Sequence, residues 1–308
     1  MRMNRRRKER ADCRSLKKGY YHLSTDGRWE GSLFYTKEQY AYGMCLIGIL
    51  TLLFDIRIYS FTLMSNHVHI ILSGTGSACL DAFDYLRRKI SARLVKDGYP
   101  PLPEDYWFKL VPVDDPEQMK RDFIYVDRNP YEKHICVPGG YPWGTGYLHY
   151  SFVGDMLIGD RAGTLSGREL ERRTGTRMSF PEHWQFHPQY GLLPASFIDN
   201  SLFTKLFRVP KEYLTNLVKD YESAVQVARS LDESPEYSEE ETRDIVETLL
   251  QKYYANSSLS KLSPDKKGRL AVILKKEYDM PESIIAHSLG FSEHLVFQFL
   301  RSKDYGKR

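Results

Sequence analysis

The stretch from Met64 to Leu72, MSNHVHIIL, limits the fold more than any other part of the chain. In a β-strand, residues two apart share a face, so His67 and His69 point the same way. The opposite face is apolar and is expected to pack on the core; it carries Val68, Ile70 and Leu72. The stretch therefore predicts a strand with one apolar face and one face that holds two imidazoles.

The segments on either side predict an α+β fold, with one sheet backed by helices. Hydrophobic spacing alternates between the strand period and the helix period along the first half of the chain. The last helix of this part is expected to begin near Asp114-Asp115-Pro116 and to stop at Pro130. The pattern predicts strands at 19–27, 57–72 (one or two strands, with a kink near Ser65 and Asn66) and 107–113, and helices at 37–54, 80–99 and 117–129.

The length of 308 residues allows for more than one domain. Residues 155–215 are rich in turns, the acidic stretch 231–244 has the composition of a solvated linker, and the rest has a helical pattern. We expect a domain at 1–153, an irregular connecting region at 154–234 and a helical domain at 235–308.

Charge and cysteine content favour a soluble cytoplasmic protein with a polyanionic partner. The formal net charge is +4, and six of the first ten residues are Lys or Arg. This arm, with Arg5, Arg6 and Arg7, fits either a nucleic-acid contact or a solvated tail. The four cysteines form no CxxC pair, as expected for reduced thiols. No segment is long and apolar enough to predict a membrane span.

The paired histidines are half of a site for a divalent metal. The alternative is a pair of half-exposed strand histidines, which an isolated HxH motif favours. The helix at 117–129 offers the missing parts on one polar stripe, where Tyr125 can be a nucleophile or simply a tyrosine at the edge of the core. The candidates for the third ligand on that stripe are Asn129, Asp122 and Gln118.

Four segments between residues 20 and 150 resemble the HUH single-tyrosine transposases, and most of all the REP-associated tyrosine transposases. FTLMSNHVHIIL resembles their LMPNHVHLLL stretch, and YVDRNPYEKHI resembles their YIxxNPVRAG segment. HLSTDGRWEGSLFYT is similar to their opening HVTxRGxxxxxLF, and YPWGTGYLHY to their PWSSYxxY. The sequence departs from the family pattern at Ser65, where the family has Pro, and at YEKH, where it has VRAG.

The resemblance implies a ferredoxin-like sheet, with the histidines on a central strand and the tyrosine on a helix across from them. It implies Mg²⁺ or Mn²⁺ held by His67 and His69, with Asn129, four residues after the tyrosine, completing the site. Tyr125 matches the nucleophile, which attacks a phosphodiester of single-stranded or hairpin DNA and leaves a 5′-phosphotyrosine and a free 3′-OH. Relatives of this kind act as monomers or homodimers.

Two further segments have features of DNA contacts. The helix at 80–99 carries basic side chains suited to phosphates, or to an ordinary solvated face: Arg87, Arg88, Lys89 and Arg93. Residues 280–303 are similar to a helix-turn-helix, with Gly290 at the turn, and the alternative is a plain helical hairpin. The residues that would then face the major groove are Ser292, Glu293, His294, Gln298 and Arg301, of which Glu293 would repel phosphates.

Three functions compete on these grounds. The first is a metal-dependent DNA transesterase, that is, a transposase-like endonuclease and strand transferase. The second is a non-catalytic DNA-binding regulator that uses the helix-turn-helix, and the third is a metal hydrolase that uses water. The intact set of Tyr125, His67 and His69 favours the first, because a pure binder needs no tyrosine beside paired histidines.

Overall fold

The structure is a computed structural model of the whole chain. It describes residues 2–25, 29, 31–132, 140–149, 157–219, 227–228, 230–231, 237, 239–254 and 258–302. Contacts divide the chain into two compact units, the first comprising residues 1–131 and 136–217 and the second comprising residues 132–135 and 218–308. The expected domain limits at 153 and 234 stay predictions, although residues 157–217 of the expected connecting region belong to the unit that contains the large sheet.

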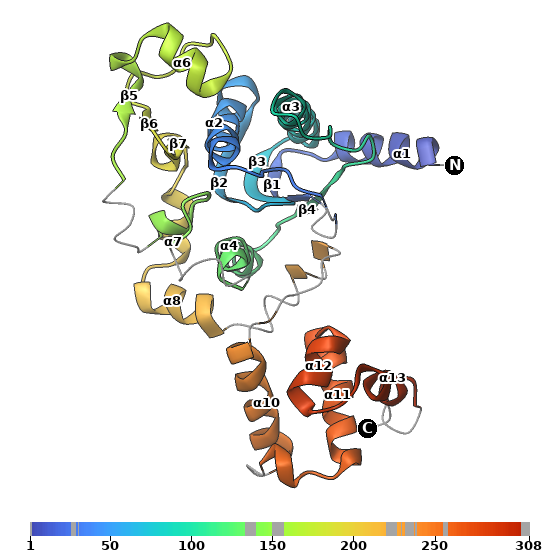
Figure 1. The fold of residues 1–308 in the computed structure, drawn as a ribbon. Coiled ribbons are helices and arrows are strands. Elements are labelled where there is room, and N and C mark those ends of the chain that lie inside the picture. Colours follow the sequence, from blue (N-terminus) through green and yellow to red (C-terminus); the bar gives the residue numbers. More distant parts are fainter. Residues whose placement is uncertain are drawn as a thin grey trace. The chain divides into compact units, whose positions relative to one another are not determined.

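The first unit is built on the strand-helix-strand-strand-helix-strand order (Figure 1). The stretch predicted as one or two strands forms two, which the turn at Ser65 and Asn66 separates. Its elements are β1 (Gly19–Thr25), α2 (Lys37–Leu53), β2 (Ile56–Leu63), β3 (Val68–Gly74), α3 (Gly76–Lys96) and β4 (Phe108–Pro112).

The four strands form one antiparallel sheet in the order β2-β3-β1-β4. This order is that of a ferredoxin-like sheet. The histidine strand β3 pairs with β1 on one side and β2 on the other, so it is a central strand. The predicted α+β class is thereby confirmed, with helices that cover the sheet.

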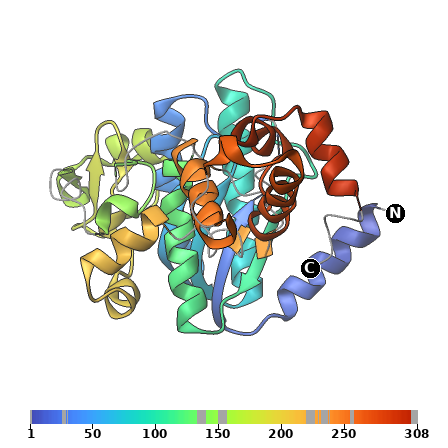
Figure 2. The same cartoon turned by 90° about the horizontal axis from the view of Figure 1, so that it is seen from below.

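Each face of the sheet has its own cover (Figures 1 and 2). Helices α2 and α3 lie on one face, where Val68, Ile70 and Leu72 join the main apolar core as predicted. Helix α4 (Pro116–Glu132) lies on the other face, where Phe123 packs in a second cluster with Ile71. The side chains of His67 and His69 point toward α4, so both faces of β3 are buried.

Helix α4 begins where the sequence predicts. Pro116 is its first residue, and the carboxylate of Asp115 accepts a hydrogen bond from the Gln118 amide at 2.8 Å, as a helix cap does. The predicted end at Pro130 is wrong, because the helix continues through it to Glu132. A proline so close to a helix end removes a single backbone bond, so it need not stop the helix there.

The helix that carries the basic arm contacts the first unit, and Arg10 is the residue of the arm that the described contacts hold in place. Helix α1 (Arg2–Ser15) packs against α3, and Arg10 forms an ion pair with Asp84 at 2.5 Å. One turn later Arg14 contacts Asp81 at 3.2 Å. These pairs use basic residues of the arm to neutralise acidic residues of α3, so less positive charge is left for a partner than the sequence suggests.

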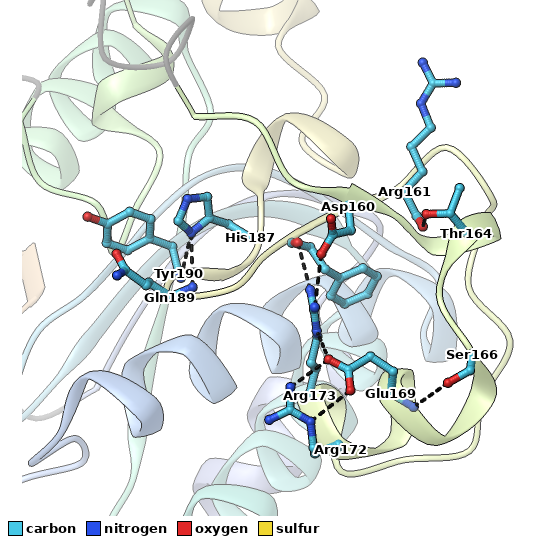
Figure 3. A network of polar contacts seen from close by, with 11 residues as sticks. Asp160, Arg161, Thr164, Ser166, Glu169, Arg172, Arg173, His187, Gln189 and Tyr190 are labelled. Atoms are coloured by element: carbon cyan, nitrogen blue, oxygen red, sulfur yellow. Dashed lines mark hydrogen bonds and ion pairs between the residues drawn. The ribbon is translucent and has the colours of Figure 1, made fainter.

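A small lobe follows α4 and packs on α2. Arg173 holds it together, since the guanidinium contacts Asp160 at 3.0 Å, Glu169 at 2.7 Å and the carbonyl oxygen of Phe186 at 3.0 Å (Figure 3). Nδ1 of His187 accepts backbone hydrogen bonds from the amides of Gln189 and Tyr190. The lobe comprises β5 (Asp160–Arg161), α6 (Gly167–Thr174), β6 (Gln185–His187) and β7 (Gly191–Leu192).

Helices α7 (Ser201–Leu206) and α8 (Pro210–Lys219) complete the first unit on the α4 side, where Phe203 and Tyr213 join the cluster with Phe123. The second unit is helical in its described residues and has a separate apolar core. None of the described helices combines the length and the apolar content that a membrane span requires. The helices of the second unit are α10 (Glu239–Tyr254), α11 (Pro264–Tyr278), α12 (Glu282–Leu289) and α13 (Glu293–Arg301).

Candidate functional site

The paired histidines lie in the middle of the sheet, beneath α4. His67 directly precedes β3, and His69 lies on it, opposite Ser24 of β1 and Thr62 of β2. Their exposed fractions are 3% and 0%. The alternative of two half-exposed strand histidines is therefore excluded, and the protein must satisfy two buried imidazoles.

Helix α4 brings Tyr125 and Asn129 to these histidines. The Tyr125 ring meets the His69 ring edge-on, with 5.3 Å between ring centres and 89° between planes. The amide of Asn129 lies between the imidazoles: its Nδ2 is 3.2 Å from Nε2 of His69, and its Oδ1 is 3.2 Å from Nε2 of His67. One turn of helix separates the two α4 residues, so both reach the same point of the sheet.

The hydrogen bonds around His67 define its tautomer. Asn66 donates from Nδ2 to the carbonyl oxygen of Trp29 at 3.1 Å, which directs its Oδ1 toward His67. That oxygen lies 2.7 Å from Nδ1 of His67, so Nδ1 carries the proton. In the neutral ring, Nε2 then has a lone pair, and this lone pair faces Asn129.

The contact between His67 and Asn129 joins two acceptors, because Oδ1 of the amide has no proton to give. Rotating the Asn129 amide by 180° would let its Nδ2 donate to His67, but its Oδ1 would then face Nε2 of His69. If that nitrogen also has a lone pair, two acceptors still face each other. A divalent ion relieves such a conflict, since imidazole nitrogens and an amide oxygen all serve as its ligands. The donor set of His67, His69 and Asn129 thus fits the expected metal.

In the described parts of the chain, no group of three or more His, Cys, Asp or Glu side chains is arranged so that it could hold a metal ion by itself. An ion at this place would depend on the two imidazoles, on the Asn129 oxygen and on ligands from solvent or substrate. Two nitrogens make the set softer than the all-oxygen sites typical of Mg²⁺, which favours Mn²⁺.

The other two candidates for the third ligand lie elsewhere. Gln118 belongs to the first turn of α4, where its Nε2 donates to the carbonyl oxygen of Pro112 at 3.0 Å. Asp122 is buried and lies 3.3 Å from Nδ1 of His22, a residue that the sequence analysis did not single out. His22 shares a face of β1 with Ser24, which lies directly opposite His69, so the register of β1 against β3 is the signal that places it here.

The predicted phosphate-binding residues are remote from the histidines. The basic residues of α3 lie on the helix that covers the opposite face of the sheet. Arg93 pairs with Asp97 at 2.6 Å, Lys89 lies over the Tyr85 ring, and Arg88 bonds the Asp84 carbonyl oxygen. Arg87 is half-buried there too. In α1, Arg7 is exposed, while the side chains of Arg5 and Arg6 lie outside the described part.

The predicted DNA-reading residues of the second unit share an exposed face of α13. Gly290 ends α12 at the predicted turn in the left-handed conformation, with φ 69°, and Ser292 caps α13 by accepting a hydrogen bond from the Leu295 amide. His294 and Gln298 contact each other at 3.0 Å. The exposed polar residues of this helix and its cap are Ser292, Glu293, His294, Gln298 and Arg301.

The far side of α4 is anchored by a buried polar cluster around Asp127. Its carboxylate lies 2.6 Å from Nδ1 of His149, and the Tyr213 hydroxyl donates to it at 2.8 Å. Burial and the negative charge of Asp127 raise the pKa of Tyr213 well above its usual value. The neighbouring Arg128 is also buried and donates to the carbonyl oxygen of Leu217 in α8 at 3.3 Å.

No model of a known protein family matches the sequence, and a search of curated proteins gives no match. Among solved structures, a REP-associated tyrosine transposase bound to a REP hairpin is similar to this chain. The alignment covers 44% of this chain and 82% of the transposase, with 13% sequence identity and a TM-score of 0.36. Such a score carries no weight for activity, so a function must be argued from the side chains.

Proposed function

We propose that the protein is a metal-dependent endonuclease and strand transferase for single-stranded DNA, with Tyr125 as its nucleophile. One observation carries the proposal: a tyrosine and an amide on the same helix face lie against two buried histidines of a central strand. A structural core has no need for three imidazoles, a carboxylate and an amide in one buried cluster, because each costs stability unless it is fully paired.

In the proposed reaction the Tyr125 oxygen attacks the phosphorus of a phosphodiester. A bond forms between Oη and phosphorus as the bond to the 3′ oxygen breaks, and the 3′ oxygen takes up a proton while the phenol loses one. The products are a 5′-phosphotyrosine and a free 3′-OH. The phosphotyrosine bond conserves the energy of the phosphodiester, because water has not attacked it. The same 3′-OH can therefore attack the phosphotyrosine and reverse the step, or the 3′-OH of another strand can attack it and be joined instead.

His67, His69 and Asn129 would hold the divalent ion, which supplies positive charge to the scissile phosphate and to the charge that develops on it. The protein itself contributes rigidity, because both histidines lie in or next to a central strand and Asn129 shares its helix with the nucleophile. One chain supplies all of these residues, so the proposed reaction does not require a second copy.

A partner in single-stranded or hairpin form fits the nucleophile's position. Only 4% of the Tyr125 surface is exposed, so the phosphate must come to the helix rather than the tyrosine reach out to the DNA. A duplex holds its backbone too rigidly for in-line attack at such a depth, whereas an unpaired strand can bend. The basic residues of α1 and α3 are then proposed contacts for parts of the DNA distant from the scissile phosphate.

The low exposure of Tyr125 also favours a second candidate function, a DNA-binding regulator without catalysis. In that case α13 would read duplex DNA, and the buried cluster would be a remnant that serves the fold. The two functions differ in one product, because only the enzyme forms a covalent bond to DNA.

A denaturing gel tests the proposal. The full chain is incubated with Mn²⁺ and labelled single strands from the flanks of its own gene, beside Tyr125→Phe and a matched control, Tyr20→Phe, at an exposed tyrosine of β1. We expect a slowly migrating covalent band for the wild type and Tyr20→Phe, and none for Tyr125→Phe. Cleavage that persists in Tyr125→Phe would indicate a hydrolase that uses water, and DNA binding with neither product would indicate the regulator.

A further inference from the structure

A third buried histidine lies behind His69 and is not part of the proposed metal ligands. Nε2 of His22 is 3.2 Å from Nδ1 of His69, on the side of that ring away from Asn129. The other nitrogen of His22, Nδ1, is 3.3 Å from Oδ1 of Asp122. His22 and Asp122 are 1% and 2% exposed, so water does not compete for these contacts.

The proton between the two histidines has two possible positions. If His69 carries it on Nδ1, it donates to Nε2 of His22, and the His22 proton on Nδ1 then lies beside the Asp122 carboxylate. This contact is an electrostatic one at 3.3 Å and is not aligned as a hydrogen bond, since Nδ1 of His22 has no hydrogen-bond partner among the described residues. If His22 carries it on Nε2, the neutral ring turns a lone pair on Nδ1 toward the carboxylate. The second arrangement sets two acceptors 3.3 Å apart in a buried place, which is costly.

We propose that His22 and Asp122 are positioning residues that fix His69 with its proton on Nδ1 and its Nε2 lone pair turned toward Asn129. The carboxylate selects the orientation of His22, and His22 selects the tautomer of His69. Each step follows from a distance in the cluster. His67 reaches the same tautomer through Asn66, so the two rings offer equivalent nitrogens.

The position of Asp122 has no structural benefit of its own. Its Oδ2 is buried and has no hydrogen-bond partner among the described residues. A half-satisfied buried carboxylate lowers stability, so a side chain selected only for the fold would be apolar here. Replacing Asp122 with Leu removes this carboxylate but also takes the charged neighbour from Nδ1 of His22, so its two effects on the midpoint of urea unfolding oppose each other, while the tautomer of His69 is no longer fixed.

The consequence for metal binding rests on the proposed function. A ligand histidine whose second nitrogen is held by a partner binds its ion more tightly, and loss of such a partner costs about 10–100-fold in affinity. Asp122 stands one helical turn before Tyr125, so the same helix supplies the nucleophile, a metal ligand and the residue that orients another.

The first test is the tautomer itself, in the metal-free full chain. Imidazole ¹⁵N–¹H correlation spectra distinguish the two nitrogens, and the His69 signals are assigned from their loss in His69→Gln. We expect the proton on Nδ1 in the wild type and a mixture of tautomers in Asp122→Leu. A wild-type His69 with its proton on Nε2, or with both nitrogens protonated, would overturn the proposal.

The second test is a Mn²⁺ titration of His22→Gln and His22→Asn. Glutamine can place its oxygen near the position of Nε2 and still accept from His69, whereas asparagine is too short to reach it. We expect the affinity for Mn²⁺ to fall by roughly 10–100-fold in His22→Asn and by much less in His22→Gln. Equal affinity of the asparagine variant and the wild type would contradict the proposal. A wild type that binds no Mn²⁺ would instead contradict the proposed metal site, and the tautomer would still decide the role of His22.

Discussion

Asn129 is the residue whose role can be tested with the smallest change in shape. Asn129→Asp keeps the size of the side chain and replaces a neutral oxygen with a charged one, so it should bind Mn²⁺ at least as tightly as the wild type. Asn129→Ala removes the oxygen and should weaken binding by roughly tenfold or more. Isothermal titration with Mn²⁺ measures both, and equal affinity of Asn129→Ala and the wild type would exclude a role as ligand.

Tyr213 shows how a single buried hydrogen bond stabilises the side of α4 away from the histidines. Tyr213→Phe removes a donor to the Asp127 carboxylate and should lower the free energy of unfolding by about 1.5–3 kcal/mol. Urea unfolding at pH 7 measures the loss. The control is Tyr20→Phe, an exposed position where a change within about 0.5 kcal/mol is expected.

The raised pKa of Tyr213 also gives a direction for the effect of alkaline pH. The folded protein keeps the phenol proton above pH 10, where an unfolded tyrosine, with a pKa of about 10, has begun to lose it. Stability from this group is therefore complete below pH 10 and falls as pH rises further. Tyr42, whose pKa burial raises to about 12, adds to the fall. The urea midpoint should fall between pH 8 and pH 11 in both proteins, and this fall should be smaller in Tyr213→Phe than in the wild type.

Among the elements, α4 has some features that the sequence predicts and others that it does not. Its start and its polar stripe follow from period and spacing, whereas the meeting of Tyr125 and Asn129 with the histidines is what the resemblance to the tyrosine transposases implies. The sequence did not predict that Asp127 and Arg128 are buried, because a stripe on one face is expected to leave the other face in water. Residues 142–149 and α8 cover that face, and their positions depend on distant parts of the chain.

The sequence analysis included His22 only as the first residue of HLSTDGRWEGSLFYT and predicted no role for it, for a related reason. A single histidine in a strand with apolar neighbours is common, and only the register of β1 against β3 places it behind His69. Register depends on the paired strands and on the loops between them, so one strand alone does not reveal it. The bend at Ser65 and Asn66, by contrast, was visible because turn residues interrupt an apolar run.

At the scale of the whole molecule, the exposed face of α13 in the second unit is a candidate DNA contact that can be tested separately. Arg301 lies over the exposed Phe297 ring on the face of α13 that would read duplex DNA in the second candidate function. Arg301→Ala should weaken binding to duplex DNA. It should also reduce, by about one, the slope of the logarithm of the binding constant against the logarithm of the salt concentration. Lys252→Ala on α10 removes a charge of the same sign and should leave this slope unchanged. Titrations of the full chain with duplex DNA at several salt concentrations measure these slopes. Equal slopes for Arg301→Ala and the wild type would exclude α13 as the contact.

The central claim of a tyrosine nucleophile can be tested on a single peptide. Trypsin cuts after Arg121 and Arg128 and releases residues 122–128, in which Tyr125 is the only one of the chain's 22 tyrosines. Mass spectrometry of the covalent DNA adduct, after nuclease trimming, should find the nucleotide on this peptide. A nucleotide on any other peptide, or cleaved DNA with an unmodified peptide, would contradict the proposed mechanism.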